Sequence, residues 1–406
     1  MIVIIELSAL IILFIINIML TKKVNKPSSY LILPFISIVI IFLLFSPGTE
    51  YNEIDPLLIL VWLIAYVPFF FVDLFNNNYA NRRRIKERIK SGESNKPLYL
   101  LLFLFSVSFL FRAFSIIGSN DYIYYISTNY FALELASGLY EYLRSLLMTL
   151  VIVCIGNTRF RLLEIVSITL GILILTLFQI KGMLLMPIVA GCLYYISKNK
   201  IKIKFNIILF SIVLGFLSFF IVYSVPYLYN LEFSYVFSLN YISFVLSKVF
   251  TFLFSGILGF DSSIIYNNID IGIKTILAPL SNILRHLTGW ERVILQRAPI
   301  TISIDGTSSN VGTLFGTVYM FTNIGFTLIY SFMLALLSKL LLFLSQMYNN
   351  RWIQTMYYNL LAIFIFSWFE FYFWHQYIIT MFLWCFLSIL IDYIIRKVKI
   401  SYRRIT

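Results

Sequence analysis

Long apolar runs recur along almost the whole chain, and each is close to the roughly 20 residues that cross a bilayer as a helix. Of the 406 residues, 60% are hydrophobic and only 12% are charged, whereas soluble domains carry about 25% charged residues. Because a backbone surrounded by lipid must satisfy its own hydrogen bonds, such runs fold as helices. The sequence therefore predicts an all-α, polytopic membrane helical bundle.

The loops between the apolar runs alternate in charge, and this alternation predicts how the chain is oriented. About eleven spans are predicted, at about 2–20, 30–46, 56–75, 98–117, 139–156, 162–178, 183–196, 205–226, from about 323, 354–372 and 377–395. Basic loops stay in the cytoplasm, and the most basic stretch is NRRRIKERIK at 81–90. We therefore predict a multi-pass protein of the bacterial cytoplasmic (inner) membrane, with its N-terminus outside and its C-terminus in the cytoplasm. The net charge of +13 follows from this topology, so no nucleic-acid partner is predicted.

Three regions follow from the spacing of the spans. Residues 1–226 form an N-terminal membrane bundle of eight spans, residues 227–322 one large extracytoplasmic loop, and residues 323–406 three spans with a basic cytoplasmic tail. Within the loop, residues 234–260 are apolar enough to span, but a crossing there would invert every later loop against the positive-inside rule. We favour an interfacial or re-entrant helix for this segment, and a span remains the alternative.

Basic residues on the outer side oppose the topological tendency and so require another explanation. They are Arg112, Arg144, Lys181, Lys248, Lys274, Arg285, Arg292 and Arg297. Guanidinium groups bind phosphate bidentately, so a cluster at the membrane edge suits a diphosphate whose lipid tail stays in the bilayer. The alternative for each residue is a structural role: snorkelling or helix capping, or an interface anchor for Lys181. For Arg112 and Arg144 it is a carboxylate partner, such as Asp121 for Arg112 and Glu141 for Arg144.

Acid–base candidates are few, since the chain has two histidines and both are predicted outside. His286 lies beside Arg285, and His375 shares a predicted outer turn with Glu370. Glu370 and His375 are suited to form a proton-transfer pair, although the aromatic residues between them also fit a membrane-interface turn. The three cysteines lie in apolar runs and lack the spacing of a zinc site. We predict neither a metal site nor a cofactor.

Two passages are similar to a known family. The hairpin LFQIKGMLLMPIVAGCLYY has a basic residue, Lys181, at its outer turn, and the passage SSNVGTLFGTVYMFTNIG closes the large loop. Both resemble the Wzy-type oligosaccharide repeat-unit polymerases of capsule and O-antigen pathways. Asn310, Tyr319 and Gly325 match that family's closing pattern, whereas Thr322-Asn323-Ile324 stands where the family often has an Asp-Phe pair.

The resemblance implies a GT-C-like membrane transferase that joins undecaprenyl-diphosphate-linked oligosaccharide units at the outer face of the membrane. In that case Arg112, Lys181, Arg285, Arg292, Asn310 and Tyr319 would bind substrate. Arg297 would stabilise the leaving diphosphate, and His286, Glu370 or His375 would deprotonate the acceptor. A flippase and a chain-length regulator are expected partners.

Other functions remain open at this point. An O-antigen ligase-like transferase would have the same layout, and a GT-C enzyme that uses another lipid-linked sugar would use paired acids such as Glu50, Glu53 and Asp55. A flippase or transporter is less consistent with the sequence, because the mid-span positions are almost free of ionisable groups.

Overall fold

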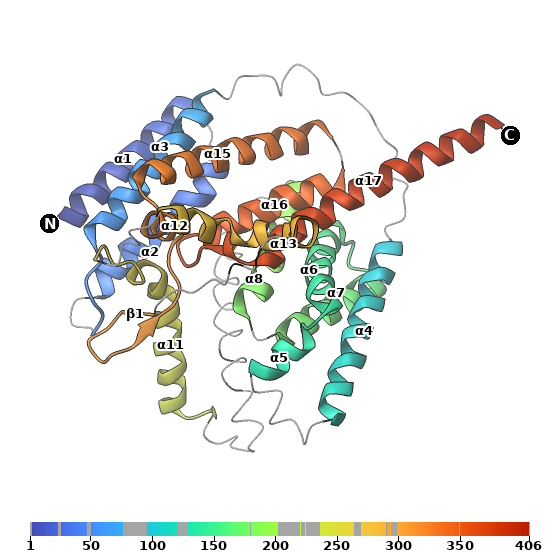
Figure 1. Cartoon of the computed structure of the whole chain (residues 1–406), viewed down its shortest axis with the longest axis horizontal. Coiled ribbons are helices and arrows are strands. Elements are labelled where there is room, and N and C mark those ends of the chain that lie inside the picture. Colours follow the sequence, from blue (N-terminus) through green and yellow to red (C-terminus); the bar gives the residue numbers. More distant parts are fainter. Residues whose placement is uncertain are drawn as a thin grey trace. The chain divides into compact units, whose positions relative to one another are not determined.

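The computed structural model of the chain describes residues 2–22, 26–46, 50–75, 96–119, 129–178, 180–201, 220, 224, 236–263, 269–289, 291, 293, 299–348 and 350–405. Most of these residues are helical (Figure 1), as predicted. Within the described ranges, eight helices are long and apolar enough to cross a membrane, and two shorter apolar helices accompany them. The chain therefore has the helices of a multi-pass membrane protein.

Most of the long helices coincide with predicted spans, whereas α5, α12, α13 and α14 correspond to no predicted span. They are α1 (Ile2–Thr21), α2 (Pro27–Phe45), α3 (Pro56–Leu74), α4 (Lys96–Ser119), α5 (Asn129–Leu135), α6 (Leu139–Asn157), α7 (Leu162–Leu177), α8 (Lys181–Lys198), α11 (Leu239–Leu258), α12 (Ile269–Ile276), α13 (Ala278–Thr288), α14 (Leu314–Phe321), α15 (Ile324–Met347), α16 (Arg351–Phe366) and α17 (Gln376–Ile405). A 3-10 turn, η3 (Tyr372–Trp374), and two short strands, β1 (Ile300–Thr301) and β2 (Ser308–Ser309), complete the elements. The predicted span at 205–226 lies outside the described residues, apart from Phe220 and Ser224.

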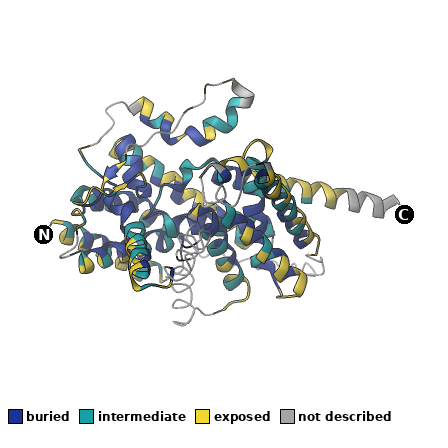
Figure 2. Cartoon of the chain, turned by 90° about the horizontal axis from the view of Figure 1, so that it is seen from below, coloured by how far each residue is buried: buried dark blue, intermediate teal, exposed yellow. Residues whose placement is uncertain are grey.

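The chain forms two compact units, each built from several stretches of sequence. Unit 1 comprises Met1–Glu87, Thr251–Tyr348 and Leu360–Ile379, and unit 2 comprises Arg88–Phe250, Asn349–Asn359 and Thr380–Thr406. Figure 2 shows helices whose buried residues lie on one side and whose exposed residues lie on the other. Exposed apolar residues along α1 and α15 are expected where a helix faces lipid. The three predicted sequence regions stay a prediction.

In unit 1, α1, α3 and α15 run parallel to one another. Two hydrogen bonds between α3 and α15 show this: the Ser331 hydroxyl donates to the Ala65 carbonyl, and the Lys339 ammonium donates to the Val72 carbonyl at 2.7 Å. The later residue of α15 thus bonds to the later residue of α3. The same order holds for α1 and α3. The Phe14 ring lies against Tyr66, and the Asn17 amide, further along α1, donates to Asp73, further along α3. If all three helices cross the membrane, they cross it in the same direction.

By contrast, α2 is antiparallel to α3. In the first turn of α2, the Ser28 hydroxyl donates to Asp73, near the end of α3. Further along α2, the Phe35 ring stacks on Trp62, earlier in α3, with 3.9 Å between ring centres. This order agrees with the predicted alternation of the first three spans.

The parallel arrangement of α3 and α15 also constrains the number of crossings between them. Two spans in the same direction require an odd number of crossings in the intervening chain. If α4, α6, α7 and α8 all cross, they contribute four crossings, so one more is needed to make the number odd. Either the predicted span at 205–226 or α11 supplies it, but not both. Although α11 is long and apolar enough to span, the prediction that it does not cross is compatible with this parity.

The loop before α3 lies on the same side of unit 1 as the β hairpin. Main-chain hydrogen bonds join Asn52 N–H to the Ile302 carbonyl and Ile304 N–H to the Glu50 carbonyl, and the Asp55 carboxylate accepts from Ser262 N–H. Both segments were predicted to lie outside. Their mutual contact therefore supports placing the residues after α11 on the same side as the α2–α3 loop.

This placement predicts a labelling pattern. In a Cys192→Ser background, Glu53→Cys and Ile304→Cys are expected to react with a membrane-impermeant maleimide in right-side-out membrane vesicles, because both native side chains are exposed and share one side. Lys22→Cys, at the other end of α1, is expected to react only after permeabilisation. Labelling of Glu53→Cys without Ile304→Cys would contradict the fold of unit 1, and the reverse pattern for Lys22→Cys would overturn the orientation.

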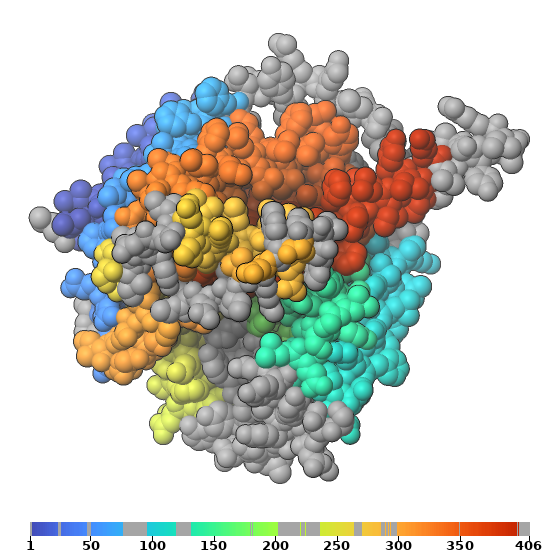
Figure 3. All heavy atoms as spheres, in the orientation of Figure 1, coloured from blue at the N-terminus to red at the C-terminus, as the bar shows by residue number. Residues whose placement is uncertain are grey.

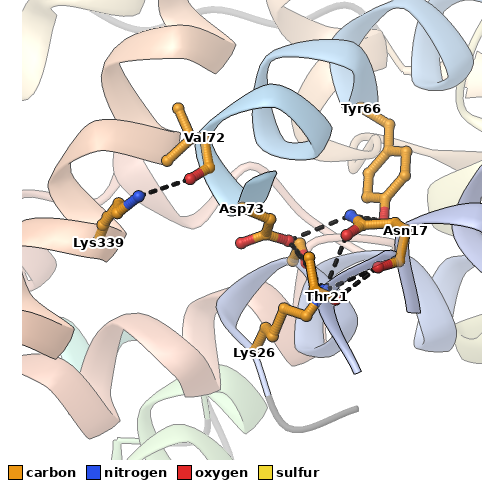
Figure 4. Close-up of polar contacts among 8 residues, drawn as sticks. Asn17, Thr21, Lys26, Tyr66, Val72, Asp73 and Lys339 are labelled. Atoms are coloured by element: carbon orange, nitrogen blue, oxygen red, sulfur yellow. Dashed lines mark hydrogen bonds and ion pairs between the residues drawn. The ribbon is translucent and has the colours of Figure 1, made fainter. Parts of the chain in front are cut away.

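A buried polar cluster joins the ends of α1, α2 and α3 opposite this loop (Figure 4). The Lys26 ammonium, only 3% exposed, donates to the Asn17 side-chain oxygen at 2.7 Å and lies 3.8 Å from the Asp73 carboxylate. The Asn17 amide in turn donates to the Tyr66 hydroxyl at 2.8 Å. Lys26 also reaches the Asn17 carbonyl near the end of α1. A cation there is favourable, because it lies near the negative end of the helix dipole.

Candidate functional site

The segment that closes the large loop enters unit 1 before α15 begins. The Thr313 hydroxyl accepts from the Trp62 indole at 3.1 Å, and it caps α14 by accepting from Gly316 N–H. Trp62 is six residues into α3, which places it ~9 Å below the start of that helix. Thr313 itself is completely buried, as is most of α14. The segment is therefore re-entrant.

Neighbouring main chains hold this re-entrant segment. The N–H groups of Thr313 and Leu314 donate to the carbonyls of Gly256 and Ser367, at 3.2 and 2.8 Å. A side chain at Gly256 would place its Cβ only 2.4 Å from the Trp368 and Phe369 carbonyl oxygens. Since no side chain larger than hydrogen fits there, the end of α11 packs directly on the turn that follows α16.

The chain then returns to the end of unit 1 at which α3 begins, and there starts α15. Gly316 lies against Leu58, one turn closer to the start of α3 than Trp62. Phe321, at the end of α14, presents its carbonyl to Gly272 of α12. The Asn323 side chain accepts from Phe326 N–H at 2.8 Å and so caps α15. Asn323 therefore has a structural role at this point.

Two residues from the predicted closing pattern lie on this segment. Asn310 is exposed just before the chain enters unit 1. Tyr319 is half-buried in α14, and its ring centre lies 6.2 Å from that of Phe260. Their assignment to substrate binding stays a prediction.

Glu370 and His375 form a hydrogen-bonded pair in the turn between α16 and α17. The Glu370 carboxylate oxygen Oε1 lies 2.7 Å from His375 Nε2, and the two side chains are 23% and 33% exposed. The predicted proximity of these two residues is therefore present in the structure. A partly exposed imidazole held by a carboxylate has the geometry of a proton-transfer pair.

Aromatic side chains hold the turn in place around this pair. The Trp374 indole donates to the Thr275 carbonyl of α12 at 2.9 Å, and its ring packs edge-on against Phe321. The His375 ring stacks on Tyr377 with 5.0 Å between ring centres. Burial raises the pKa of Tyr372 well above its ordinary value, so this tyrosine remains a neutral member of the turn.

Helix α13 brings a basic residue to the same part of unit 1. It packs against η3, the turn between Glu370 and His375, and it carries the half-buried Arg285. Figure 3 shows α12 and α13 at the surface of this view. Gly289, with a φ of 71°, ends α13 by donating its N–H to the Arg285 carbonyl. His286 also lies on α13, but its side chain is not among those that the structure describes. Arg292 and Arg297 lie outside the described residues.

In unit 2, Arg112 holds the segment between α5 and α6. Its guanidinium donates to the carbonyls of Leu135 and Glu134 and to the Ser137 hydroxyl, at 3.2, 2.8 and 2.7 Å. It also lies 4.3 Å from the centre of the Tyr140 ring. The predicted partner Asp121 lies outside the described residues. These contacts give Arg112 a structural role, and its role in diphosphate binding stays a prediction.

Removing this guanidinium is expected to destabilise the protein. Arg112→Lys keeps the charge but cannot reproduce the planar fork that reaches three acceptors, so we expect a loss of about 1–3 kcal/mol. Thermal unfolding of the purified protein in detergent measures the loss. An equal melting temperature for Arg112→Lys and the native chain would show that these hydrogen bonds contribute nothing measurable.

Arg144 and Lys181 lie near Arg112 in unit 2. The Arg144 guanidinium lies 5.5 Å from the centre of the Phe178 ring, and Phe178 also packs against Phe109, one turn before Arg112. Phe178 immediately precedes the α7–α8 turn, and Lys181 is the first residue of α8. Three of the basic residues predicted outside are thus at one end of unit 2, although the Lys181 side chain is outside the described part.

Sequence reasoning did not identify the residues that build this site. Thr313, Trp62, Thr275 and Trp374 position the re-entrant segment and the Glu370–His375 turn, but each lies in an apolar or mixed stretch with no recognisable motif. Among the residues that the structure describes, no three His, Cys, Asp or Glu side chains are placed to hold an ion. The prediction that no metal is needed stays a prediction.

Comparisons with known proteins give one match. A family model described as a family of unknown function (DUF6337) matches residues 51–402. No curated protein and no solved structure matches the chain.

Proposed function

The chain belongs to the DUF6337 family, whose function is unknown, and we propose from its own geometry that it is a membrane glycosyltransferase. It polymerises oligosaccharide repeat units carried on undecaprenyl diphosphate at the outer face of the bacterial cytoplasmic membrane. The observation that carries this proposal is the hydrogen-bonded Glu370–His375 pair, 2.7 Å apart, in a turn packed against the helix that carries Arg285.

The pair supplies the base that glycosyl transfer requires. With Nε2–H donating to Glu370, the Nδ1 lone pair of His375 accepts the proton of the acceptor hydroxyl. The acceptor oxygen then bonds to the anomeric carbon, and the bond from that carbon to the diphosphate breaks. Glu370 stabilises the imidazolium that forms, as the carboxylate does in other His–carboxylate pairs.

Positive charge on the same side stabilises the leaving diphosphate. Arg285 is on the helix that packs against the turn, and the predicted ligands Arg292 and Arg297 follow it in the sequence. Guanidinium groups suit this task because they bind phosphate oxygens in pairs and remain charged at any physiological pH. The polyprenyl chain stays in the membrane throughout.

Analysis of lipid-linked glycans tests this function. Cells that lack the chain are expected to accumulate single repeat units on the lipid carrier, exposed on the outer face, and to lose long glycans. Arg285→Ala is expected to reproduce part of this defect at a normal protein level, since a half-exposed charge contributes little to stability. The measurement is glycan length and sidedness after extraction of the carrier lipid.

Other classes of protein would give other products. Long glycans that remain on the carrier would indicate a ligase, and single units accessible only from the cytoplasm would indicate a flippase. Either result would rule out the polymerase.

A further inference from the structure

Helices α12 and α13 leave an apolar edge exposed next to the Glu370–His375 turn. Ile271, Leu277 and Leu280 are 60%, 43% and 45% exposed, whereas the opposite side of the same helices is buried, with Ile276 at 3% and Ala278 at 0%. Lys274, one turn after Ile271, is exposed as well. Apolar residues with a cation between them are typical of a helix that lies in a membrane interface.

The depth of these helices follows from contacts within unit 1. Gly272 of α12 lies against the carbonyl oxygen of Phe321, the last residue of α14. From Thr313, at the level of Trp62, the eight residues of α14 rise ~10 Å, which brings Phe321 close to the level of the start of α3. The membrane span α15 begins three residues later, at Ile324. Helix α12 therefore lies at the outer boundary of the spans.

We propose that α12 and α13 lie in the outer leaflet and insert the edge formed by Ile271, Leu277 and Leu280 among the lipid chains. Lys274 then reaches the phosphate groups of the lipid headgroups, as lysines at membrane interfaces do. A large apolar side chain exposed to water at this depth would be unfavourable, whereas at the lipid boundary the same exposure is favourable. The partner of this surface is thus the bilayer itself.

This inference is independent of the proposed function. It assigns the two helices a place in the membrane, whatever reaction the neighbouring turn performs. Together with the position of η3 against α13, it puts the Glu370–His375 turn beside lipid headgroups.

The β hairpin offers a matched control. Ile304 is also a large apolar residue and is 81% exposed. Its N–H donates to the main-chain carbonyl of Glu50, which lies five residues before Asp55, the cap of α3. It therefore lies further out from the membrane than α12. A nitroxide label at Leu277→Cys, Leu280→Cys or Ile304→Cys compares the two surfaces in the full-length chain. Cys192 is replaced by serine, and the buried Cys154 and Cys385 are left in place.

The test measures collision of each label with oxygen, which concentrates in the bilayer, and with a water-soluble nickel chelate. In vesicles of phosphatidylcholine and phosphatidylglycerol, the oxygen-to-nickel ratio is expected to be several-fold higher at positions 277 and 280 than at 304. Equal ratios at the three positions would place the edge in water, and labels protected from both reagents would place it under a second copy or another protein. Either result would overturn the proposal. Two independent label positions, each checked by size-exclusion elution, keep the test valid if one variant misfolds.

Discussion

Replacing His375 by glutamine is expected to lower the rate of glycan transfer by about 10²–10⁴-fold, the usual contribution of a general base. Glutamine retains a hydrogen-bonding group for Glu370 but cannot take up the acceptor proton. Glu370→Gln is expected to cause a smaller loss, because the imidazole remains but the imidazolium loses its carboxylate partner. The measurement is the initial rate of chain extension by the purified protein on lipid-linked repeat units.

The double variant distinguishes a catalytic pair from two independent effects. Residues that act as one unit lose activity together, so the double variant is expected to be no slower than His375→Gln alone. Glu53→Gln is the matched control, because it removes an exposed carboxylate on the same side of the protein without touching the turn. Native rates for both single variants would exclude the pair from the mechanism.

Replacing Lys26 by methionine is expected to destabilise the protein by up to about 3–5 kcal/mol, the cost of breaking a buried ion pair. The Asp73 carboxylate, whose side chain is only 13% exposed, would keep the hydrogen bonds from Asn17 and Ser28 but lose the ammonium that lies 3.8 Å from it. The end of α1 would also lose the ammonium that reaches the Asn17 carbonyl. Thermal unfolding in detergent or nanodiscs measures the effect.

Two further variants identify the cause of this loss. Lys22→Met removes an exposed lysine from the same loop and is expected to leave the melting temperature unchanged. The double variant Lys26→Met/Asp73→Leu removes both charges, and it is expected to recover part of the lost stability, because an apolar pair does not leave a buried charge uncompensated. A melting temperature for Lys26→Met equal to that of Lys22→Met would show that the cluster contributes nothing to stability.

The proximity of Glu370 and His375 was predictable because both lie in one short turn between two spans. Five residues of separation bring two side chains within reach in many turn conformations. The hydrogen bond itself, and the packing of Trp374 on Thr275 that holds the turn, depend on residues almost a hundred positions away. No spacing in the sequence indicates such a contact.

The sequence alone determined most of the long apolar helices, because a helix in lipid closes its own backbone hydrogen bonds and is therefore visible as a local apolar run. This locality is why the predicted and observed bounds of α3, α6 and α7 agree within one residue. The sequence did not predict the shorter helices α5, α12, α13 and α14. Only the tertiary structure decided where the polar segments go. Thr313 is buried against Trp62, and Arg112 is bound to the α5–α6 segment. A buried polar side chain needs a hydrogen-bond partner, and helix packing decides which partner is within reach.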